Sequence, residues 1–548
     1  MQRPAGLVAL GAAALAALYL AFAASSPVSL GFFGDDAVYL TTAKGLAEGR
    51  GYRHLSIPGE PLQTKYPPLY PALLSLVLRA RPDLPGNFTW LLAPGALAGA
   101  GAVVLAALYW RRVLGASRRF ALALAVLAAL SPALLSFTRV AMSELPYALF
   151  AIAALLCLDD RALRADGRAR TGWLLLGALL VGCAMLTRAI GLSLAIAAVA
   201  TLLLRRRGAD ALLVGAVILA CVAPWWSWQA GAEAANGAGG RALLVAHELG
   251  YGGFLPKDPQ EALRVAWQNL LRLSFGLGYF QLALPVESVR AAIGAGGVRL
   301  ALLHVICHAT LLFALFGFWQ SARSGLRTLH VYAAIYGAIL LVWTFSPYRF
   351  LVPWTPFTLY FAATGLLAAL RARWLAGAAF AIVLALFLAE DWKLARSTEQ
   401  AYYAREVAID WTELRAAEQF LRERTEPGDV IASSHPERLF LTTGRRGHFF
   451  WPDTDPVAFE YDAGRAASRF AALPVPAEAE ARGRDVERGL SEAYRDAKIA
   501  WYVDWSARES ARAFSHAALA MQGRFERVYT TPGGSFAIYR VRIPGTQR

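Results

Sequence analysis

Long runs of apolar residues recur through the first 390 residues of this 548-residue chain, and no other sequence feature limits its fold as strongly. A helix that crosses the hydrocarbon core of a bilayer needs about 20 consecutive, mostly apolar residues. The apolar residue types make up 57% of the chain, which is more than a typical soluble domain contains. The sequence therefore predicts a polytopic α-helical membrane protein.

The apolar runs predict about 11 transmembrane spans. Their approximate ranges are residues 5–24, 88–110, 119–138, 144–158, 172–188, 190–204, 211–230, 298–320, 329–346, 350–370 and 374–390. Residues 67–80 are too short and too closely flanked by prolines to span comfortably. We expect them to form an interfacial helix in the first outer loop.

The formal net charge of +15 comes largely from arginines in the short loops between predicted spans. This distribution differs from the continuous basic surface of a nucleic-acid-binding protein, so no nucleic-acid partner is predicted. With the N-terminus inside, these loops fall on one side, as the positive-inside rule requires. They contain Arg111, Arg112, Arg118, Arg119, Arg161, Arg164, Arg168, Arg170, Arg205, Arg206, Arg207, Arg323, Arg327, Arg371 and Arg373.

The composition changes near residue 395, where charged residues become more frequent and apolar runs become short. Residues 403–424 have a helical pattern, and residues 429–433 and 498–505 are typical of strands. Two further apolar segments flank a Pro-Gly-Gly turn at 532–534, which indicates a β-hairpin. The sequence thus predicts a membrane domain over 1–394 and an extracytoplasmic α/β domain over 395–548.

Unusual polar residues gather at the predicted outer ends of the spans. They are Asp35, Asp36, Lys65, Tyr66, Arg139, Glu144, Arg188, Tyr348 and Arg349. Charged groups are costly near lipid, so we expect these side chains to face a bundle interior or a water-filled cavity. Cations could neutralise a leaving phosphate, and a carboxylate could take the proton of an attacking hydroxyl. This chemistry fits inverting sugar transfer from a lipid phosphate, and a second carboxylate could orient the acceptor or hold a divalent cation.

Several short motifs occur in a fixed order along the chain. They are D-D-A-V-Y at 35–39, K-Y-P-P-L-Y-P at 65–71, M-S-E-L-P at 142–146, L-T-R-A-I-G at 186–191, A-P-W-W at 223–226, Y-R-F-L-V-P at 348–353 and H-P-E-R-L-F-L-T-T-G-R-R at 435–446. In order and topology they resemble the GT-C superfamily of integral-membrane glycosyltransferases. The nearest resemblance is to its bacterial ArnT-like and protein O-mannosyltransferase-like branch.

The resemblance implies roles for individual residues. Asp35 aligns with the catalytic aspartate of the family, Asp36 with its acidic or amide neighbour, and Glu144 with a second acidic residue. Lys65 and Tyr66 lie where relatives bind the lipid-linked phosphate. Tyr66 stands directly before the Pro-Pro pair, where ArnT-like enzymes carry lysine, and Lys65 is shifted by one place.

The resemblance also implies the reaction and its setting. The expected donor is a polyprenyl-phosphate sugar, and the expected acceptor is a hydroxyl of an envelope lipid, a glycan or a protein. The protein would lie in the bacterial inner (plasma) membrane among its lipids, with a cytoplasmic N-terminus and a periplasmic or extracellular C-terminal domain. The only cofactor considered is a divalent cation held by the second carboxylate.

Structural explanations exist for the same residues. Asp35 and Asp36 could cap the helix that follows them, and Glu144 could lie in the first turn of another. Lys65 and Arg188 could extend to the membrane interface, and Arg349 could form a structural ion pair. His304 and His308 have a spacing that can ligate a metal, although no third ligand is apparent, so no metal site is predicted.

Two other functions also use this kind of architecture. One is a transporter or flippase of lipid-linked sugars, and the other is a non-catalytic subunit of envelope assembly. A transporter is expected to carry broken helices near mid-membrane and internal repeats. Here the charges lie at one end of the spans and no repeat is evident, which favours an enzyme.

Overall fold

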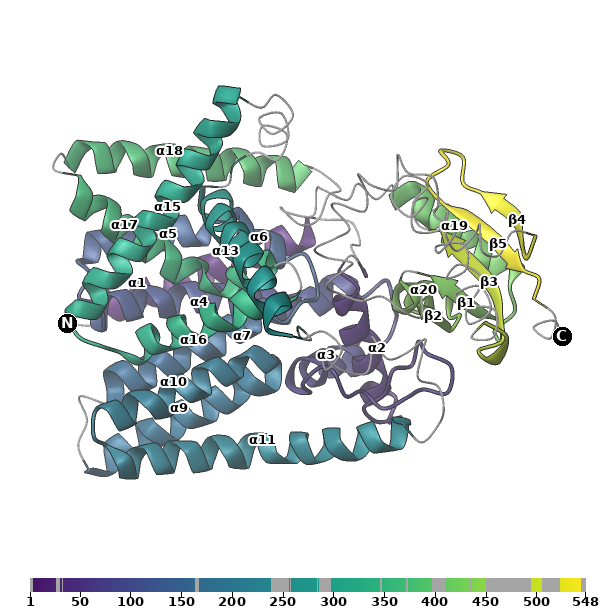
Figure 1. Ribbon diagram of the computed structural model, residues 1–548, viewed down its shortest axis with the longest axis horizontal. Helices are drawn as coiled ribbons and strands as arrows, with labels where there is room; N and C mark the ends of the chain where they lie inside the picture. Colours follow the sequence, from purple (N-terminus) through teal and green to yellow (C-terminus); the bar gives the residue numbers. More distant parts are fainter. Residues whose placement is uncertain are drawn as a thin grey trace.

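A computed structural model of the chain consists mostly of helices, with a small β-sheet toward the C-terminus (Figure 1). The structure describes residues 3–25, 30–31, 33–162, 167–237, 256, 258–282, 284, 297–344, 347–370, 373–396, 411–433, 435–449, 494–504 and 523–543.

The last described helix of the helical domain ends at Arg396, and the boundary after residue 394 stays a prediction. Its helices are α1 (Arg3–Ala24), α2 (Asp35–Ala47), α3 (Leu69–Ala80), α4 (Phe88–Arg112), α5 (Arg118–Ala129), α6 (Pro132–Phe137), α7 (Glu144–Leu156), α9 (Gly167–Thr187), α10 (Leu192–Leu204), α11 (Gly208–Gly237), α13 (Pro259–Leu282), α15 (Gly297–Arg323), α16 (Thr328–Val342), α17 (Thr355–Ala369) and α18 (Arg373–Arg396). Its described residues also include the π-helix η1 (Cys157–Arg161) and the 3₁₀-helices η2 (Ala189–Gly191) and η4 (Tyr348–Trp354).

Among the described residues, 6 helical segments are long and apolar enough to cross a membrane. They are Phe88–Arg112, Gly167–Thr187, Gly208–Asn236, Gly297–Arg323, Tyr348–Ala369 and Trp374–Arg396. Leu10–Ala24, Leu69–Ala80, Ala189–Leu204 and Thr328–Val342 are apolar but shorter. The fold is that of a polytopic membrane protein, and the number of about 11 spans stays a prediction.

Two segments differ from the sequence-based expectation. The predicted span over 119–138 is divided into α5 and α6, because Pro132 has no backbone N–H to continue the helix and instead begins α6. Residues 259–282 were expected in an outer loop but form α13, which packs against α15 and α16. Its buried positions include Asn269, whose side-chain amide donates to the carbonyls of Leu340, Leu341 and Trp343. A polar residue on the packed face interrupts the apolar stripe by which such a helix is recognised.

In its described residues the C-terminal domain contains a mixed five-stranded sheet and the helices α19 and α20, which confirms the expected α/β character. Its elements are α19 (Trp411–Arg424), β1 (Val430–Ser433), α20 (Pro436–Thr443), β2 (Gly447–Phe449), β3 (Ile499–Asp504), β4 (Phe525–Thr530) and β5 (Ala537–Val541). The strand order is β2-β1-β3-β5-β4, parallel across β2-β1-β3 and antiparallel across β3-β5-β4. The predicted hairpin is therefore present as β4 and β5. Leu414, Ala417 and Leu421 of α19 pack on one face of the sheet, against residues such as Ile431 and Ile538.

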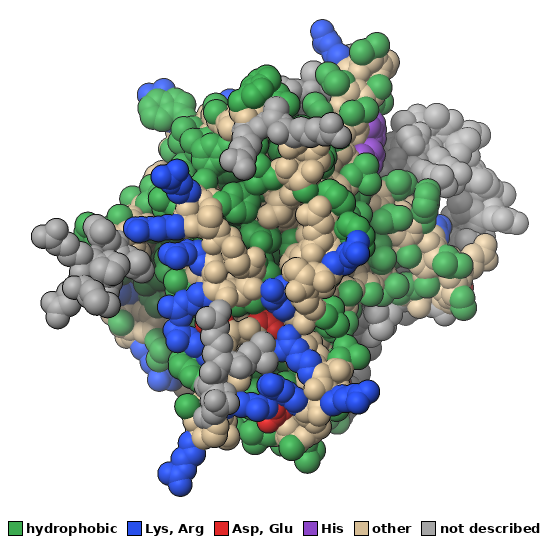
Figure 2. Space-filling model, turned by 90° about the vertical axis from the view of Figure 1, so that its left-hand side faces the viewer, with side chains coloured by type: hydrophobic (Ala, Val, Ile, Leu, Met, Phe, Trp, Pro, Cys, Tyr) green, Lys and Arg blue, Asp and Glu red, His purple; other side chains and the backbone are tan. Residues whose placement is uncertain are grey.

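The two domains meet at the first loop. Figure 1 shows α2 and α3 between the helical bundle and the C-terminal domain, and α2 is in contact with α20. Lys and Arg side chains gather at the opposite end of the bundle, which faces the viewer in Figure 2. This basic end is the arrangement expected from the short arginine-rich loops.

Candidate active site

Asp35 and Asp36 are the first two residues of α2, and their side chains have different surroundings. The N-cap of α2 is Gly34, at φ 73°, so neither aspartate is the N-cap residue itself. Asp36 is fully buried, and its carboxylate accepts hydrogen bonds from the backbone N–H groups of Gly31 (2.7 Å) and Phe33 (3.0 Å). It thus closes the turn that precedes the helix.

The Asp35 side chain lies among polar groups brought from elsewhere in the chain. Tyr66 donates its hydroxyl to Oδ1 at 2.6 Å, and Arg349 Nη2 lies 2.6 Å from Oδ2. Burial raises the pKa of Asp35, but the positive charges of Arg349 and Lys65 and the hydrogen bond from Tyr66 outweigh it, so the pKa lies below its usual value. Asp35 is therefore ionised at neutral pH.

Arg349 also connects Asp35 to a second carboxylate. Its Nε lies 3.5 Å from Glu144 Oε1, and Arg188 Nη1 lies 2.8 Å from the same oxygen. Arg188 in addition donates to Ser143 Oγ at 2.9 Å, and the Tyr39 hydroxyl lies 3.0 Å from that atom. We call Asp35, Glu144, Arg188 and Arg349 the ion-pair cluster.

The ion-pair cluster has a buried side and an accessible side. The Glu144 side chain is 0% exposed and that of Arg188 is 9% exposed. The corresponding values for Asp35 and Arg349 are 21% and 25%. Arg188 and Glu144 therefore support the arrangement from behind, while Asp35 and Arg349 form the edge that a substrate can reach.

Lys65 lies beside this edge. Its backbone N–H and that of Tyr66 both donate to Gln63 Oε1, at 2.9 and 3.3 Å, which fixes the turn before the Pro-Pro pair. Lys65 Nζ lies 5.3 Å from the centroid of the Tyr66 ring, and the Lys65 charge lowers the pKa of Asp35. The one-place shift of lysine in this motif thus leaves its charge next to the carboxylate.

Two predicted site residues lie elsewhere. Arg139 is fully buried and donates from Nη1 to the carbonyl of Leu394 in α18 at 2.7 Å, and its guanidinium lies 5.4 Å from the centroid of the Phe22 ring. Tyr348 packs against α13, where a Cβ added to Gly276 would lie 2.6 Å from carbons of the Tyr348 ring. The structure therefore brings together Asp35, Lys65, Tyr66, Glu144, Arg188 and Arg349, whereas the side chains of Asp36, Arg139 and Tyr348 contact other parts of the fold.

Tyr39 was not predicted as a site residue, although a signal for it exists. It follows Asp35 by four residues in the D-D-A-V-Y motif, so both lie on the same side of α2. Within the described ranges, no three residues of metal-ligating type gather at one point. His304 Nδ1 and His308 Nε2 lie 3.4 Å apart; His304 is exposed and His308 is half-buried.

A family model described as "Dolichyl-phosphate-mannose-protein mannosyltransferase" matches residues 65–228. No curated protein sequence matches the chain.

Solved structures resemble the chain over nearly its whole length. The crystal structure of ArnT from Cupriavidus metallidurans bound to undecaprenyl phosphate has a TM-score of 0.57 and 13% identity, covering 100% of this chain and 99% of that one. The archaeal oligosaccharyltransferase AglB from Archaeoglobus fulgidus, in complex with an inhibitory peptide and a dolichol-phosphate, has a TM-score of 0.52 and 14% identity, covering 96% of this chain and 74% of that one.

At these identities the structural matches show a shared fold, and the family match adds a sequence relation over residues 65–228. The motifs that suggested the resemblance are now joined in space, since the first loop, α7, the segment around Arg188 and η4 all contribute to the ion-pair cluster. The chain therefore shares the fold of these membrane glycosyltransferases, and its residues 65–228 are similar to the mannosyltransferase family.

Proposed function

We propose that this protein transfers a sugar from a polyprenyl-phosphate donor to a hydroxyl group of an envelope lipid, a glycan or a protein, with inversion at the anomeric carbon. The observation that carries the proposal is the position of Arg349, between the accessible carboxylate of Asp35 and the buried carboxylate of Glu144. A cation and an ionised acid at one accessible edge suit a leaving phosphate beside an attacking hydroxyl.

In the proposed reaction the acceptor oxygen attacks the anomeric carbon while Asp35 takes its proton. The bond between that carbon and the phosphate oxygen breaks, and polyprenyl phosphate leaves with the bonding electrons. Because this leaving group is an anion of low basicity, it needs neutralisation rather than protonation. Arg349 and Lys65 supply positive charge at the edge, and Arg188 holds Glu144 so that Glu144 orients Arg349.

The roles of the remaining predicted residues follow from their surroundings. Tyr66 orients Asp35 through its 2.6 Å hydrogen bond. We assign Asp36 to the support of the turn before α2, and Arg139 and Tyr348 to packing around the site. The proton acceptor is thus Asp35 rather than Asp36.

We further propose that the site faces the outside of the inner membrane, with the C-terminal domain on the same side. The gathering of Lys and Arg at the other end of the bundle supports this orientation (Figure 2). In that setting the donor is presented from the outer leaflet.

The proposal is tested in two steps. Mass spectrometry of polyprenyl-linked sugars in a strain that lacks the protein should reveal one species that accumulates, which is the unused donor. Membranes containing the wild-type protein should then release polyprenyl phosphate from that purified species, and membranes containing the Asp35→Asn variant should not. Equal release by both would remove Asp35 from the mechanism, and release by neither would argue against a transferase that uses this donor.

A further inference from the structure

The turn that precedes the proposed base is held by the C-terminal domain. Leu30 and Gly31 lie five and four residues before Asp35, in the turn that leads into α2, and Gly31 has a φ of 77°, a conformation that residues other than glycine rarely adopt. Asp36 closes this turn from inside through its hydrogen bond from Gly31. Asp35 lies between this turn and Asp36, so the position of the turn decides where the proposed base lies.

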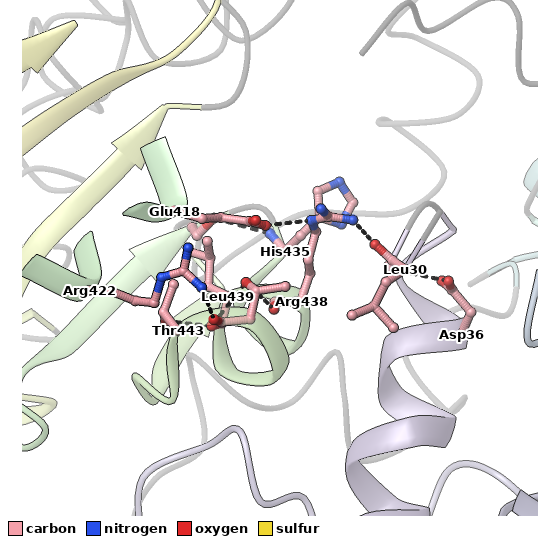
Figure 3. Close-up of polar contacts among 11 residues, drawn as sticks. Leu30, Asp36, Glu418, Arg422, His435, Arg438, Leu439 and Thr443 are labelled. Atoms are coloured by element: carbon pink, nitrogen blue, oxygen red, sulfur yellow. Dashed lines mark hydrogen bonds and ion pairs between the residues drawn. The ribbon is translucent and has the colours of Figure 1, made fainter. Parts of the chain in front are cut away.

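Arg438 of α20 reaches the same turn from outside. Its Nη1 donates to the carbonyl of Leu30, and its Nε donates to Glu418 Oε1 of α19 at 2.8 Å. The guanidinium also lies 4.8 Å from the centroid of the Trp411 ring. Figure 3 shows Arg438 between Glu418 and Leu30, with Asp36 on the far side of Leu30.

The contact is close as well as polar. Arg438 is 3% exposed, so its hydrogen bonds are shielded from water. A Cβ added to Gly31 would lie only 2.6 Å from the Arg438 Cβ, so α20 presses directly on the backbone of the turn. Burial lowers the pKa of Arg438, while the carboxylates of Glu418 and Asp36 raise it. Arg438 is thus the residue through which the sheet domain and the start of α2 are joined.

We propose that Arg438 is a positioning residue for the transfer reaction: by fixing Leu30 and Gly31 to the C-terminal domain, it sets the position of Asp35. The inference depends on the proposed role of Asp35 as base. A general base works only within hydrogen-bond reach of the proton it takes, and a displacement of about 1 Å can cost about 100-fold in rate. The C-terminal domain would therefore act on the chemical step without touching the donor.

The first loop also offers a matched control. Arg446 belongs to the same domain and donates from Nε to the carbonyl of Leu55 at 3.2 Å, and it pairs with Glu60. Beside it, the N–H of Gly447 donates to the carbonyl of Ser56 at 2.8 Å. Arg446 thus docks the domain onto the first loop some distance along the chain from Asp35. If docking alone mattered, Arg438 and Arg446 would be equivalent.

The experiment compares full-length variants for release of polyprenyl phosphate from the lipid-linked sugar that accumulates in the deletion strain. For Arg438→Ala we expect kcat to fall about 10- to 100-fold with the donor KM within about twofold. Arg438→Lys should recover only part of the loss in kcat, because a single ammonium group cannot reach both the Leu30 carbonyl and the Glu418 carboxylate. Arg446→Ala should stay within about threefold of the wild type.

A second pair of variants approaches the turn from the other side. Gly31→Ala would place a methyl group against Arg438, while Gly49→Ala places one in open space at a similar φ of 73°. Both carry a left-handed backbone, so their strain is comparable, and only Gly31→Ala should lower kcat as Arg438→Ala does. Thermal unfolding and size-exclusion profiles provide the amount of folded protein for normalisation.

Several results would overturn the inference. They are an unchanged kcat in Arg438→Ala, an equal loss in Arg446→Ala, a change confined to the donor KM, or equal activity of the two glycine variants. A wild-type protein that releases no polyprenyl phosphate, or an Asp35→Asn variant that releases it normally, would instead refute the proposed function itself.

Discussion

Two carboxylates in the helical domain are held in contrasting ways. Asp159 in η1 accepts four hydrogen bonds from neutral donors: the N–H and hydroxyl of Thr328 at 3.0 and 2.9 Å, the N–H of Leu329 at 3.3 Å and the hydroxyl of Tyr109 at 2.8 Å. Asp35, in the ion-pair cluster, is held by the hydroxyl of Tyr66 and by the cation Arg349. Both are aspartates near the ends of apolar helices, and sequence position alone does not separate them.

The difference lies in what each carboxylate leaves available. Asp159 is 5% exposed, and its oxygens stabilise the N-terminus of α16, where backbone N–H groups need an acceptor. The Asp35 side chain is 21% exposed, and one of its partners is a charged group that a phosphate can compete for. A carboxylate whose oxygens all accept hydrogen bonds from fixed neutral donors, as in Asp159, is structural. A carboxylate that pairs with an accessible cation, as in Asp35, can take part in a reaction.

The largest expected effect on the reaction rate comes from replacing the carboxylate of Asp35 by the amide of asparagine, and the same replacement at Asp159 is the control. Asp35→Asn should lower the rate of polyprenyl phosphate release by about 1,000-fold, because an amide cannot accept the acceptor's proton. Asp159→Asn should lower the amount of folded protein while leaving the rate per folded molecule within a few-fold. Rates normalised to folded protein measure this difference, and a comparable loss per molecule in both variants would abolish the distinction between the two sites.

The second expected effect concerns the cation in the ion-pair cluster. Arg349 uses Nη2 toward Asp35 and Nε toward Glu144. A lysine keeps the charge but has a single ammonium group, so it cannot hold both carboxylates in this geometry. Arg349→Lys should therefore lower kcat/KM by about 10- to 100-fold, with the loss shared between donor KM and kcat. Arg323→Lys, at the C-terminal end of α15, is the control and should behave as wild type.

The outer ends of the spans could be recognised as a site from the sequence because acids and cations are expensive beside lipid. Convergence of the first loop with Glu144, Arg188 and Arg349 followed from that argument, and the ion pairs now place these residues together. The same argument could not predict which of Asp35 and Asp36 faces the ion-pair cluster. Successive helical residues point in directions about 100° apart, so one faces the cluster and the other faces the preceding turn, and only the surrounding fold decides which.

Other features could not be predicted because they depend on partners far away in the sequence. Arg139 is a charged residue at the end of a predicted span, as a site residue would be. It instead donates to the backbone carbonyl of Leu394, and no sequence pattern around Arg139 predicts this contact. The helix α13 carries a buried polar residue, Asn269. Its side chain donates to the carbonyl of Leu340 near the C-terminal end of α16, and this partner cannot be recognised from the sequence of α13 alone. The strands of the C-terminal domain were easier, since alternating patterns and a Pro-Gly-Gly turn are local signals.

The third effect is on stability and sharpens the structural side of the comparison. Asp159→Ala would leave the N–H groups of Thr328 and Leu329 and the Tyr109 hydroxyl without their acceptor in a buried place, which should cost about 2–4 kcal/mol. The carboxylate of Asp160, the next residue, lies 3.8 Å from the guanidinium of Arg112 and 3.7 Å from that of Arg161, and both arginines are exposed. Asp160→Ala should cost about 1 kcal/mol or less. Thermal unfolding in detergent compares them, and equal midpoints would contradict the capping role of Asp159.

The smallest effect concerns Asp36, which combines features of both carboxylates. Like Asp159 it accepts from neutral backbone N–H groups, and like Asp35 it lies at the start of α2. Burial raises the pKa of Asp36 to about 6, although the two backbone hydrogen bonds and Arg438 act in the opposite direction. Asp35, with its lowered pKa, does not titrate in this range.

Protonation of Asp36 should therefore loosen the turn as the pH falls through about 6, and kcat should decrease by up to about tenfold between pH 7 and pH 5. Stability should change in the opposite sense. Because the pKa in the folded protein lies above the usual aspartate value of 3.8, the contribution of Asp36 to stability is fully present below pH 3.8 and is lost as the pH rises through 6. Opposite slopes of kcat and of the thermal midpoint between pH 5 and 7 would identify Asp36, and Asp36→Asn should remove both. A kcat that is independent of pH in the wild type would show that Asp36 supports the turn equally well in either protonation state, and would make it a purely structural carboxylate like Asp159.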